Sequence, residues 1–257
     1  MKRFCFTVDD NIRFLKELTE TPKDSIFEHP YLDMYKRLHE KFDLKVQLNL
    51  FYKMPDFDLS MVTDRYQAEF RENAHWLKMS FHSQWENVRP YEFSGYEEVY
   101  GDCKAVNDQI LRFAGIEALG KTTTIHYCRT TEDGLRAMKD LQTEGLLGLF
   151  GTMEAKRTSY SVPDCYGDTI RAGKVIDYQG VKIASIDMVI NDVKEEKLIP
   201  DLEVLLDHDQ IRVMIHEQYF YPDYPRYQEN FERKLETVFH FLGRNGYASR
   251  FFEEMLE

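Results

Sequence analysis

The sequence predicts an α/β protein whose strands and helices alternate around a (β/α) barrel. Short apolar and β-branched runs are separated by segments with helical periodicity, in about six or seven strand–helix units. Strands separated by helices pair in parallel through crossover connections. The 257 residues contain no repeat, linker or low-complexity tract, and barrels of this kind often reach such a length as one domain. We therefore expect residues 1–257 to form a single-domain barrel, complete or incomplete.

The first half of the chain alternates regularly between the two kinds of segment. The expected strands cover residues 2–8, 45–52, 76–81, 122–128 and 145–151. The expected helices cover residues 31–42, 60–73, 101–115 and 131–145. Ser60 and Thr131 are placed as N-caps, and Gly115 and Gly145 as the residues at which helices stop. Each helix can then return the chain to the start of the next parallel strand.

The second half departs from this rhythm. Residues 173–190 have the pattern of a hairpin that turns near Gln179 and Gly180. A helix is expected over 198–208, a strand over 211–217 and a long helix over 226–243. The tail that follows, YASRFFEEM, is typical of a strand or a short helix. The final strand and helix close the alternating pattern.

Composition and charge exclude several classes of function. The formal net charge is -12, from 45 acidic and 33 basic residues, so the surface should repel nucleic-acid backbones. The four cysteines form no CxxC pair, which argues against a disulfide framework and against a cysteine-bound zinc. No apolar run approaches the ~20 residues of a membrane span, and the N-terminus lacks the apolar region of a signal peptide. We expect a soluble, cytoplasmic protein with neither nucleic acid nor membrane as partner.

Ionisable residues recur where the expected strands end, and in a (β/α) barrel these ends carry the chemistry. The residues at these ends are Asp9 and Asp10, His82 and Glu86, His126 and Arg129, Asp187, and His216 and Glu217. Zinc in a hydrolytic site takes three protein ligands and leaves a position for water. Residues four apart in one helical turn lie on the same side, so His82 and Glu86 could bind one ion with Asp10 as third ligand. Asp9 could then take a proton from water, and His216 could protonate the leaving group.

Each of these residues also has a purely structural interpretation. Asp9 and Asp10 could cap a helix that begins with IRFLKEL, and His82 and Glu86 could form a solvated turn. His126, Arg129 and Asp187 are more typical of structural residues than of catalytic ones. The aromatic run EQYFYPDYPRY at 217–227 could pack on the last helix or form a rim on which sugar rings stack.

Three motifs in order resemble those of the NodB-type polysaccharide deacetylases. The segment FTVDDN (6–11) is similar to their T-F-D-D-G, HSQWE (82–86) to their H-S/T-x-x-H, and VMIHE (213–217) to their late L-x-H. The ending NGYASRFFEEM is similar to their G-Y-x-F-x-x-x-x-E. Asn11 replaces the family's glycine, Glu86 replaces its second histidine, and its R-P-P-Y motif has no good match.

The resemblance implies a distorted barrel of about seven strands and the removal of acetyl groups from amino sugars. It implies that Asp9 is the general base, that Asp10, His82 and Glu86 hold the metal, and that His216 is the catalytic acid. Arg129 stands where the family's base-orienting arginine is expected. Zinc is the expected ion, with manganese, nickel and iron as alternatives.

The sequence thus predicts a metal-dependent hydrolase that removes an acyl group, most simply acetyl, from a carbohydrate or a small amide or ester. Two alternatives stay open. One is a metal-free glycosidase that pairs Asp9 or Asp10 with Asp187 or Glu217. The other is a barrel without catalysis that binds carbohydrate or regulates a partner.

Overall fold

The computed structural model describes residues 2–86, 91–152 and 155–256. Its strands are β1 (Arg3–Asn11), β2 (Val46–Met54), β3 (Phe57–Asp58), β4 (Leu77–Trp85), β5 (Thr122–Thr123), β6 (Gly145–Gly148), β7 (Ile176–Tyr178), β8 (Val181–Ser185), β9 (Met188–Val189), β10 (Gln210–His216) and β11 (Ala248–Ser249). Its α-helices are α1 (Arg13–Glu20), α2 (Pro30–Phe42), α3 (Gln67–Asn73), α4 (Tyr96–Phe113), α5 (Glu132–Asp140), α6 (Asp164–Arg171), α7 (Leu198–Glu203) and α8 (Phe231–Arg244). Within these residues, every helix is too short or too polar to span a bilayer.

The strands pair mainly in parallel, as the alternation of strands and helices predicted. The larger sheet runs β9-β10-β1-β2-β4, with β11 parallel to β1 and β3 antiparallel to β2. The smaller sheet runs β5-β6-β8, with β7 antiparallel to β8. Single backbone hydrogen bonds link the two sheets, from Gly120 N to Met79 O and from Asp187 N to Arg212 O, each 2.8 Å long. The parallel α/β fold is confirmed, and among the described residues its strands form two sheets rather than one closed ladder.

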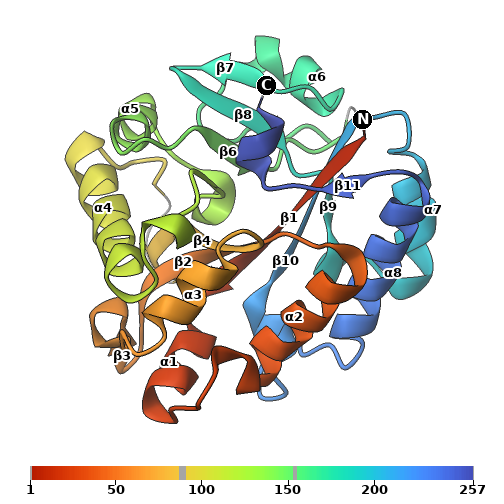
Figure 1. Ribbon diagram of the computed structural model, residues 1–257. Helices are drawn as coiled ribbons and strands as arrows, with labels where there is room; N and C mark the ends of the chain where they lie inside the picture. Colours follow the sequence, from red (N-terminus) through yellow and green to blue (C-terminus); the bar gives the residue numbers. More distant parts are fainter. Residues whose placement is uncertain (1, 87–90, 153–154, 257) are drawn as a thin grey trace.

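Helices cover the outer face of the strands, and β1 runs through the middle of the molecule (Figure 1). All of β1 after Arg3 is buried, because α2 and α8 pack on the larger sheet. Phe6 of β1 lies with its ring centroid 5.0 Å from Phe239 of α8 and 6.0 Å from Tyr35 of α2. Burial of such rings is the main favourable term in folding, and it fixes the position at which β1 ends.

Several local predictions are confirmed and others are wrong. Gln179 and Gly180 both have positive φ and join β7 to β8 as a two-residue turn, which is the hairpin predicted there. The hydroxyl of Thr131 accepts a hydrogen bond from Gly134 N and caps α5 as predicted. Ser60 is not an N-cap, because its own backbone N–H is bound by Asp58 in a short 3₁₀ turn. The expected helix stop at Gly145 is also wrong, since that residue begins β6.

Candidate metal centre and active site

A β-bulge places Asp9 and Asp10 at the end of β1. Val8 lies opposite Leu48 and Asn11 opposite Leu50, so β1 carries one more residue than β2 over this stretch. Asp10 takes up the extra length with a φ of 64°, a left-handed conformation that aspartate tolerates better than most residues. In a regular strand, adjacent side chains point to opposite faces, whereas here both carboxylates line the same cavity.

The side chain of Asn11 stabilises this bulge. A bulge disrupts the ladder and leaves carbonyl groups in need of donors. The Asn11 amide donates to Val8 O at 2.6 Å and, at 3.3 Å each, to Asp9 O and Asn49 O. Its own carbonyl accepts from the Tyr31 hydroxyl at 2.7 Å. The asparagine that departs from the deacetylase motif therefore has a structural reason.

A second bulge places His82. Phe81 of β4 lies opposite Leu50 and Ser83 lies opposite Phe51, so His82 is the extra residue. This corrects the expectation that His82 and Glu86 share a helical turn, because β4 continues to Trp85. Residues four apart in a strand are separated by about 13 Å along the chain. Spacing alone therefore does not bring Glu86 to His82.

The third member of the cluster is His126, in a turn after β5. The expected strand 122–128 ends at Thr123, and residues 126–128 form a tight turn instead. Tyr127 and Cys128 have φ values of 62° and 54°, which is uncommon for residues other than glycine. Unusual backbone of this kind often accompanies functional sites, and here it directs the His126 ring toward His82.

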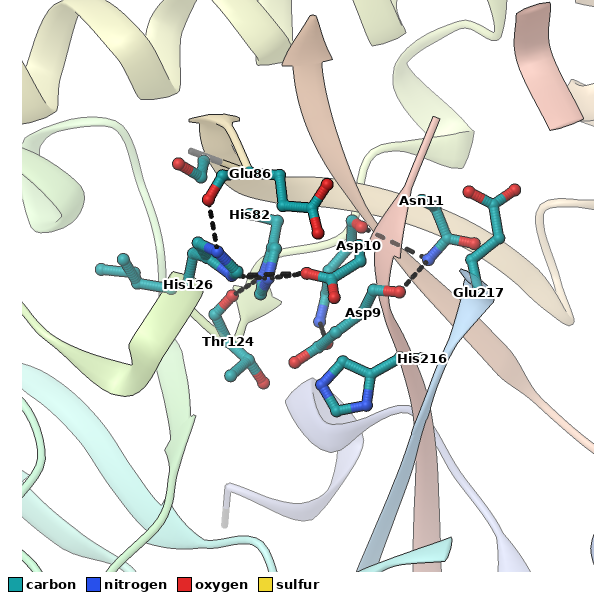
Figure 2. A network of polar contacts seen from close by, with 12 residues as sticks. Asp9, Asp10, Asn11, His82, Glu86, Thr124, His126, His216 and Glu217 are labelled. Atoms are coloured by element: carbon teal, nitrogen blue, oxygen red, sulfur yellow. Dashed lines mark hydrogen bonds and ion pairs between the residues drawn. The ribbon is translucent and has the colours of Figure 1, made fainter. Parts of the chain in front are cut away.

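Three potential ligand atoms converge at this point (Figure 2). His82 Nε2 lies 3.0 Å from Asp10 Oδ1 and 3.1 Å from His126 Nδ1, and His126 Nδ1 lies 3.3 Å from the same Asp10 oxygen. The opposite ring nitrogens face backbone carbonyls: His82 Nδ1 donates to Thr124 O, and His126 Nε2 donates to Glu86 O at 3.1 Å. Because a neutral imidazole has one N–H, these bonds leave a lone pair on each inward nitrogen.

The ionisation of the cluster follows from burial and these contacts. Burial lowers the pKa of His82 and so favours the neutral ring, although the neighbouring Asp10 acts in the opposite direction. Burial acts to raise the pKa of Asp10, but its contacts with His126 and His82 hold that pKa well below the usual value. With the opposite ring nitrogens directed to backbone carbonyls, two imidazole nitrogens and a carboxylate oxygen face one another as acceptors. A cation between them satisfies all three.

Glu86 lies beside this cluster rather than in it. Among the described residues, the group of histidines, cysteines and acids whose ligand atoms all lie within 4.8 Å of one another is Asp10, His82 and His126. The Glu86 side chain lines the same cavity, and partial burial raises its pKa, with a smaller contribution from the charge of Asp10. Its backbone carbonyl has the clearer role, since it orients His126.

Asp9 is held by a buried polar chain. Asn49 donates to Asp9 Oδ1 at 2.6 Å, and Gln47 donates to Asn49 Oδ1 at 2.9 Å and to Thr122 O at 2.8 Å. Burial raises the pKa of Asp9 well above its usual value, and the Asn49 hydrogen bond opposes this shift. A carboxylate whose pKa moves toward neutrality is suited to proton transfer.

His216 approaches Asp9 from the neighbouring strand. The two residues are register partners in the parallel pair β1–β10. Asn191 Oδ1 accepts from His216 Nδ1 at 2.9 Å, so the Nε2 atom is the one available for a proton transfer. Asp9, Asp10, His82, His126 and His216 line one cavity of about 520 Å³.

The structure places the remaining candidates away from this chemistry. Arg129 lies 3.6 Å from Glu92, with both side chains more than one third exposed, and it does not line the cavity. Asp187 is paired with Arg212 at 3.2 Å in the interior, and both are almost completely buried. Glu217 accepts hydrogen bonds from the backbone N–H groups of Ile12, Arg13 and Phe14 and caps α1. Asp187 and Glu217 are therefore both occupied by structural partners.

Comparison with known proteins relies on structure. Neither the models of known families nor the sequences of curated proteins match this chain. Among solved structures, a CE4 family pseudoenzyme from Bacillus anthracis matches with a TM-score of 0.54 and 12% identity, covering 100% of this chain and 66% of that one. A family 4 acetyl xylan esterase from Clostridium thermocellum, in complex with a cobalt ion, matches with a TM-score of 0.50 and 14% identity, covering 99% and 90%. The chain has the fold of the CE4 deacetylases.

The same fold extends to other carbohydrate enzymes. A 4-alpha-glucanotransferase from Thermococcus litoralis matches with a TM-score of 0.60 and 14% identity, covering 100% of this chain and 40% of that one. At these identities the likeness establishes architecture, and activity has to be argued from the site. The resemblance read from the sequence motifs and the CE4 fold of the structure agree. From the sequence, His126 was expected near the end of a strand, but it was not among the predicted metal ligands.

Proposed function

We propose that this chain is a metal-dependent hydrolase that removes an acyl group, most simply acetyl, from a carbohydrate. The observation that carries the proposal is the convergence of three acceptor atoms, from Asp10, His82 and His126, whose hydrogens point away toward backbone carbonyls. Metal-binding histidines typically donate their other ring N–H to a backbone carbonyl or carboxylate, which fixes the tautomer. The CE4 fold supports the same conclusion.

The residues present fit a divalent ion such as zinc, since two imidazole nitrogens and one carboxylate oxygen are a donor set found in hydrolytic sites. Manganese, nickel, cobalt and iron also bind imidazole and carboxylate ligands, so this donor set is less selective than one that binds zinc alone. When bound, such an ion supplies Lewis acidity to a carbonyl or water oxygen. Glu86 remains a candidate for a further ligand, because its carboxylate lines the cavity.

Two residues of the chain would move protons. Asp9 lies beside Asp10 but outside the cluster of Asp10, His82 and His126. It would accept a proton from the attacking water, and Asn49 holds its carboxylate in place. His216, fixed through Nδ1 by Asn191, would give a proton from Nε2 to the departing amine or alcohol. The two are register partners on neighbouring strands, so one acyl group can lie between them.

Metal binding is tested on the purified full-length protein by elemental analysis and calorimetric titration with zinc, manganese and cobalt. We expect about one ion per chain. His126→Ala should abolish binding, whereas His240→Ala, which removes an exposed histidine on α8, should leave binding unchanged. Glu86→Gln distinguishes a site of Asp10, His82 and His126 from a site that also needs Glu86. The variant keeps metal binding in the first case and loses it in the second.

Activity is tested by acetate release from acetylated xylan and from N-acetylglucosamine oligomers, with and without chelator. Asp9→Asn should keep the ion and lose about 10²- to 10⁴-fold in rate, because a general base is removed. Sugar cleavage that survives a chelator would favour the glycosidase alternative. If the protein binds glycans but releases no acetate with any of the added metal ions, it would be a non-catalytic CE4-type barrel, like the pseudoenzyme of similar fold.

A further inference from the structure

The two sheets meet at a seam between β4 and β5. Each is an edge strand, because β4 pairs with β2 in the larger sheet and β5 pairs with β6 in the smaller one. Lys121 O accepts a hydrogen bond from Glu144 N at 2.7 Å, which directs this carbonyl toward the start of β6. Successive carbonyls of a strand point in opposite directions, so the next one, Thr122 O, points away from β6 and into the seam.

The carbonyls at this seam bind side chains from the larger sheet. Thr122 O accepts from the Gln47 amide at 2.8 Å, and Thr124 O, two residues on, accepts from His82 Nδ1 (Figure 2). His82 is a proposed metal ligand, and Gln47 belongs to the polar chain that ends at Asp9. One short stretch of the smaller sheet therefore orients two parts of the site that the larger sheet carries.

The first bond of the polar chain fixes the direction of all the others. A backbone carbonyl can only accept, so the nitrogen of the Gln47 amide must face Thr122 O, and its oxygen accepts from the Thr122 hydroxyl at 3.0 Å. The same nitrogen also donates to Asn49 Oδ1 at 2.9 Å, so the Asn49 nitrogen is the atom that faces Asp9 Oδ1, at 2.6 Å. An Asn49 side chain without this partner could turn its amide over and present an oxygen to the carboxylate.

Burial makes this arrangement rigid and separates it from the substrate. Gln47, Asn49 and Thr122 are each at most 2% exposed. A reversed amide would place buried acceptors against acceptors, and such unsatisfied groups are costly where water cannot reach them. Of these three and Asp9, all of which the structure describes, Asp9 is the one that lines the metal cavity.

We propose that Gln47 is a positioning residue for hydrolysis, which keeps the N–H of Asn49 directed at Asp9 and so holds that carboxylate in place to accept a proton. The inference rests on the proposed function and adds to it the residue that sets the geometry of the base. Arg129, which the motif resemblance placed in this role, lies beside Glu92 and away from the cavity. Gln47 acts through Asn49 and touches neither the substrate nor the ion.

Steady-state kinetics of acetate release tests this role on the full-length protein with zinc, manganese or cobalt bound. The substrates are acetylated xylan and N-acetylglucosamine oligomers. Gln47→Met keeps the length of the side chain but removes the amide, so Asn49 can turn its oxygen toward Asp9. We expect kcat to fall about 10- to 10²-fold, because misplacement of a catalytic group by about 1 Å can cause a loss of that size. KM and the metal content should equal those of the wild type, because Gln47 lies behind the wall of the cavity.

Further variants separate positioning from a purely structural role. Thr122→Val removes the hydroxyl that binds the Gln47 oxygen and should lower kcat, whereas Thr122→Ser keeps a hydroxyl and should retain kcat. This pair also decides the question if Gln47→Met does not fold. Ser80→Ala is the matched control. Ser80 lies opposite Asn49 in the β2–β4 pair and is 2% exposed, and its hydroxyl has no hydrogen-bond partner among the residues that the structure describes. Its removal should leave kcat unchanged.

The outcomes distinguish failure of the positioning role from failure of the proposed function. A wild-type kcat in Gln47→Met, or a loss of bound metal in that variant, would overturn the positioning role and keep the hydrolase. Equal kcat values in Thr122→Val and Thr122→Ser would do the same. If the wild type releases no acetate with any of the three ions, the proposed function fails and the positioning role fails with it.

Discussion

Glu217 gives the sharpest prediction, because a buried carboxylate should make stability depend on pH in a defined window. It is almost completely buried and caps α1 through three backbone N–H groups. Burial raises its pKa from 4.5 to about 7, with the backbone hydrogen bonds limiting the rise. The folded state therefore holds a proton that the unfolded state has lost between these two values. The contribution of Glu217 to the free energy of unfolding is therefore fully present below pH 4.5 and is lost as the pH rises through 7.

The magnitude follows from the shift. A difference of about 2.5 pKa units corresponds to about 3 kcal/mol at 1.36 kcal/mol per unit. Glu217→Gln cannot titrate, so the free energy of unfolding of the wild type minus that of the variant should fall by about 3 kcal/mol between pH 4.5 and 8. Subtraction cancels the titration of other buried acids such as Asp9. Urea unfolding followed by circular dichroism at several pH values measures this difference.

A flat difference curve would refute the reasoning. It would mean that three N–H donors and the N-terminus of α1 compensate fully for burial, so that Glu217 ionises as it does in water. Glu20→Gln, on the exposed end of the same helix, is the control for removal of a carboxylate. A fall that is equally large in this control would also contradict an origin at Glu217.

Three further predictions follow from contacts in the fold and the site. Asp187→Ala should destabilise the protein by about 3–5 kcal/mol in urea unfolding, because Arg212 is left buried without its partner, and a loss below about 1 kcal/mol would contradict this. Thr131→Ala should cost about 1 kcal/mol by the same method through loss of the α5 cap, and an unchanged stability would show that the cap is dispensable. Asn191→Ala should lower kcat for acetate release but less than His216→Ala, since it removes only the partner of Nδ1, and an unaltered kcat would exclude a positioning role.

The sequence predicted the parallel α/β fold because each strand and helix has its own local pattern. Patterning placed β1, β2, β4 and β10 and the helices between them, since buried strands and amphipathic helices differ in period. It failed at residues 122–128, where β-branched residues favour a strand but the backbone turns at Tyr127 and Cys128. That turn depends on tertiary contacts, which no local pattern records.

The candidate site was predictable in part. Asp9, Asp10, His82 and His216 were placed together because parallel strands bring their carboxyl ends to one edge. No local pattern favoured His126 over Glu86 as a ligand, because the choice depends on β4 remaining a strand through Trp85. A β-bulge is defined by the register between two paired strands, and a sequence does not state which residues lie opposite one another.

The two bulges have a consequence for how this site relates to its scaffold. Asp9–Asp10 and His82 occupy stretches where one strand carries a residue more than its neighbour, so the sheet would pair without interruption if that surplus were removed. Shortening β1 or β4 by one residue at these points should keep the molecule folded while the ligand set is dispersed. The pairing that builds the sheet and the residues that form the Asp10–His82–His126 cluster therefore depend on separable parts of the chain.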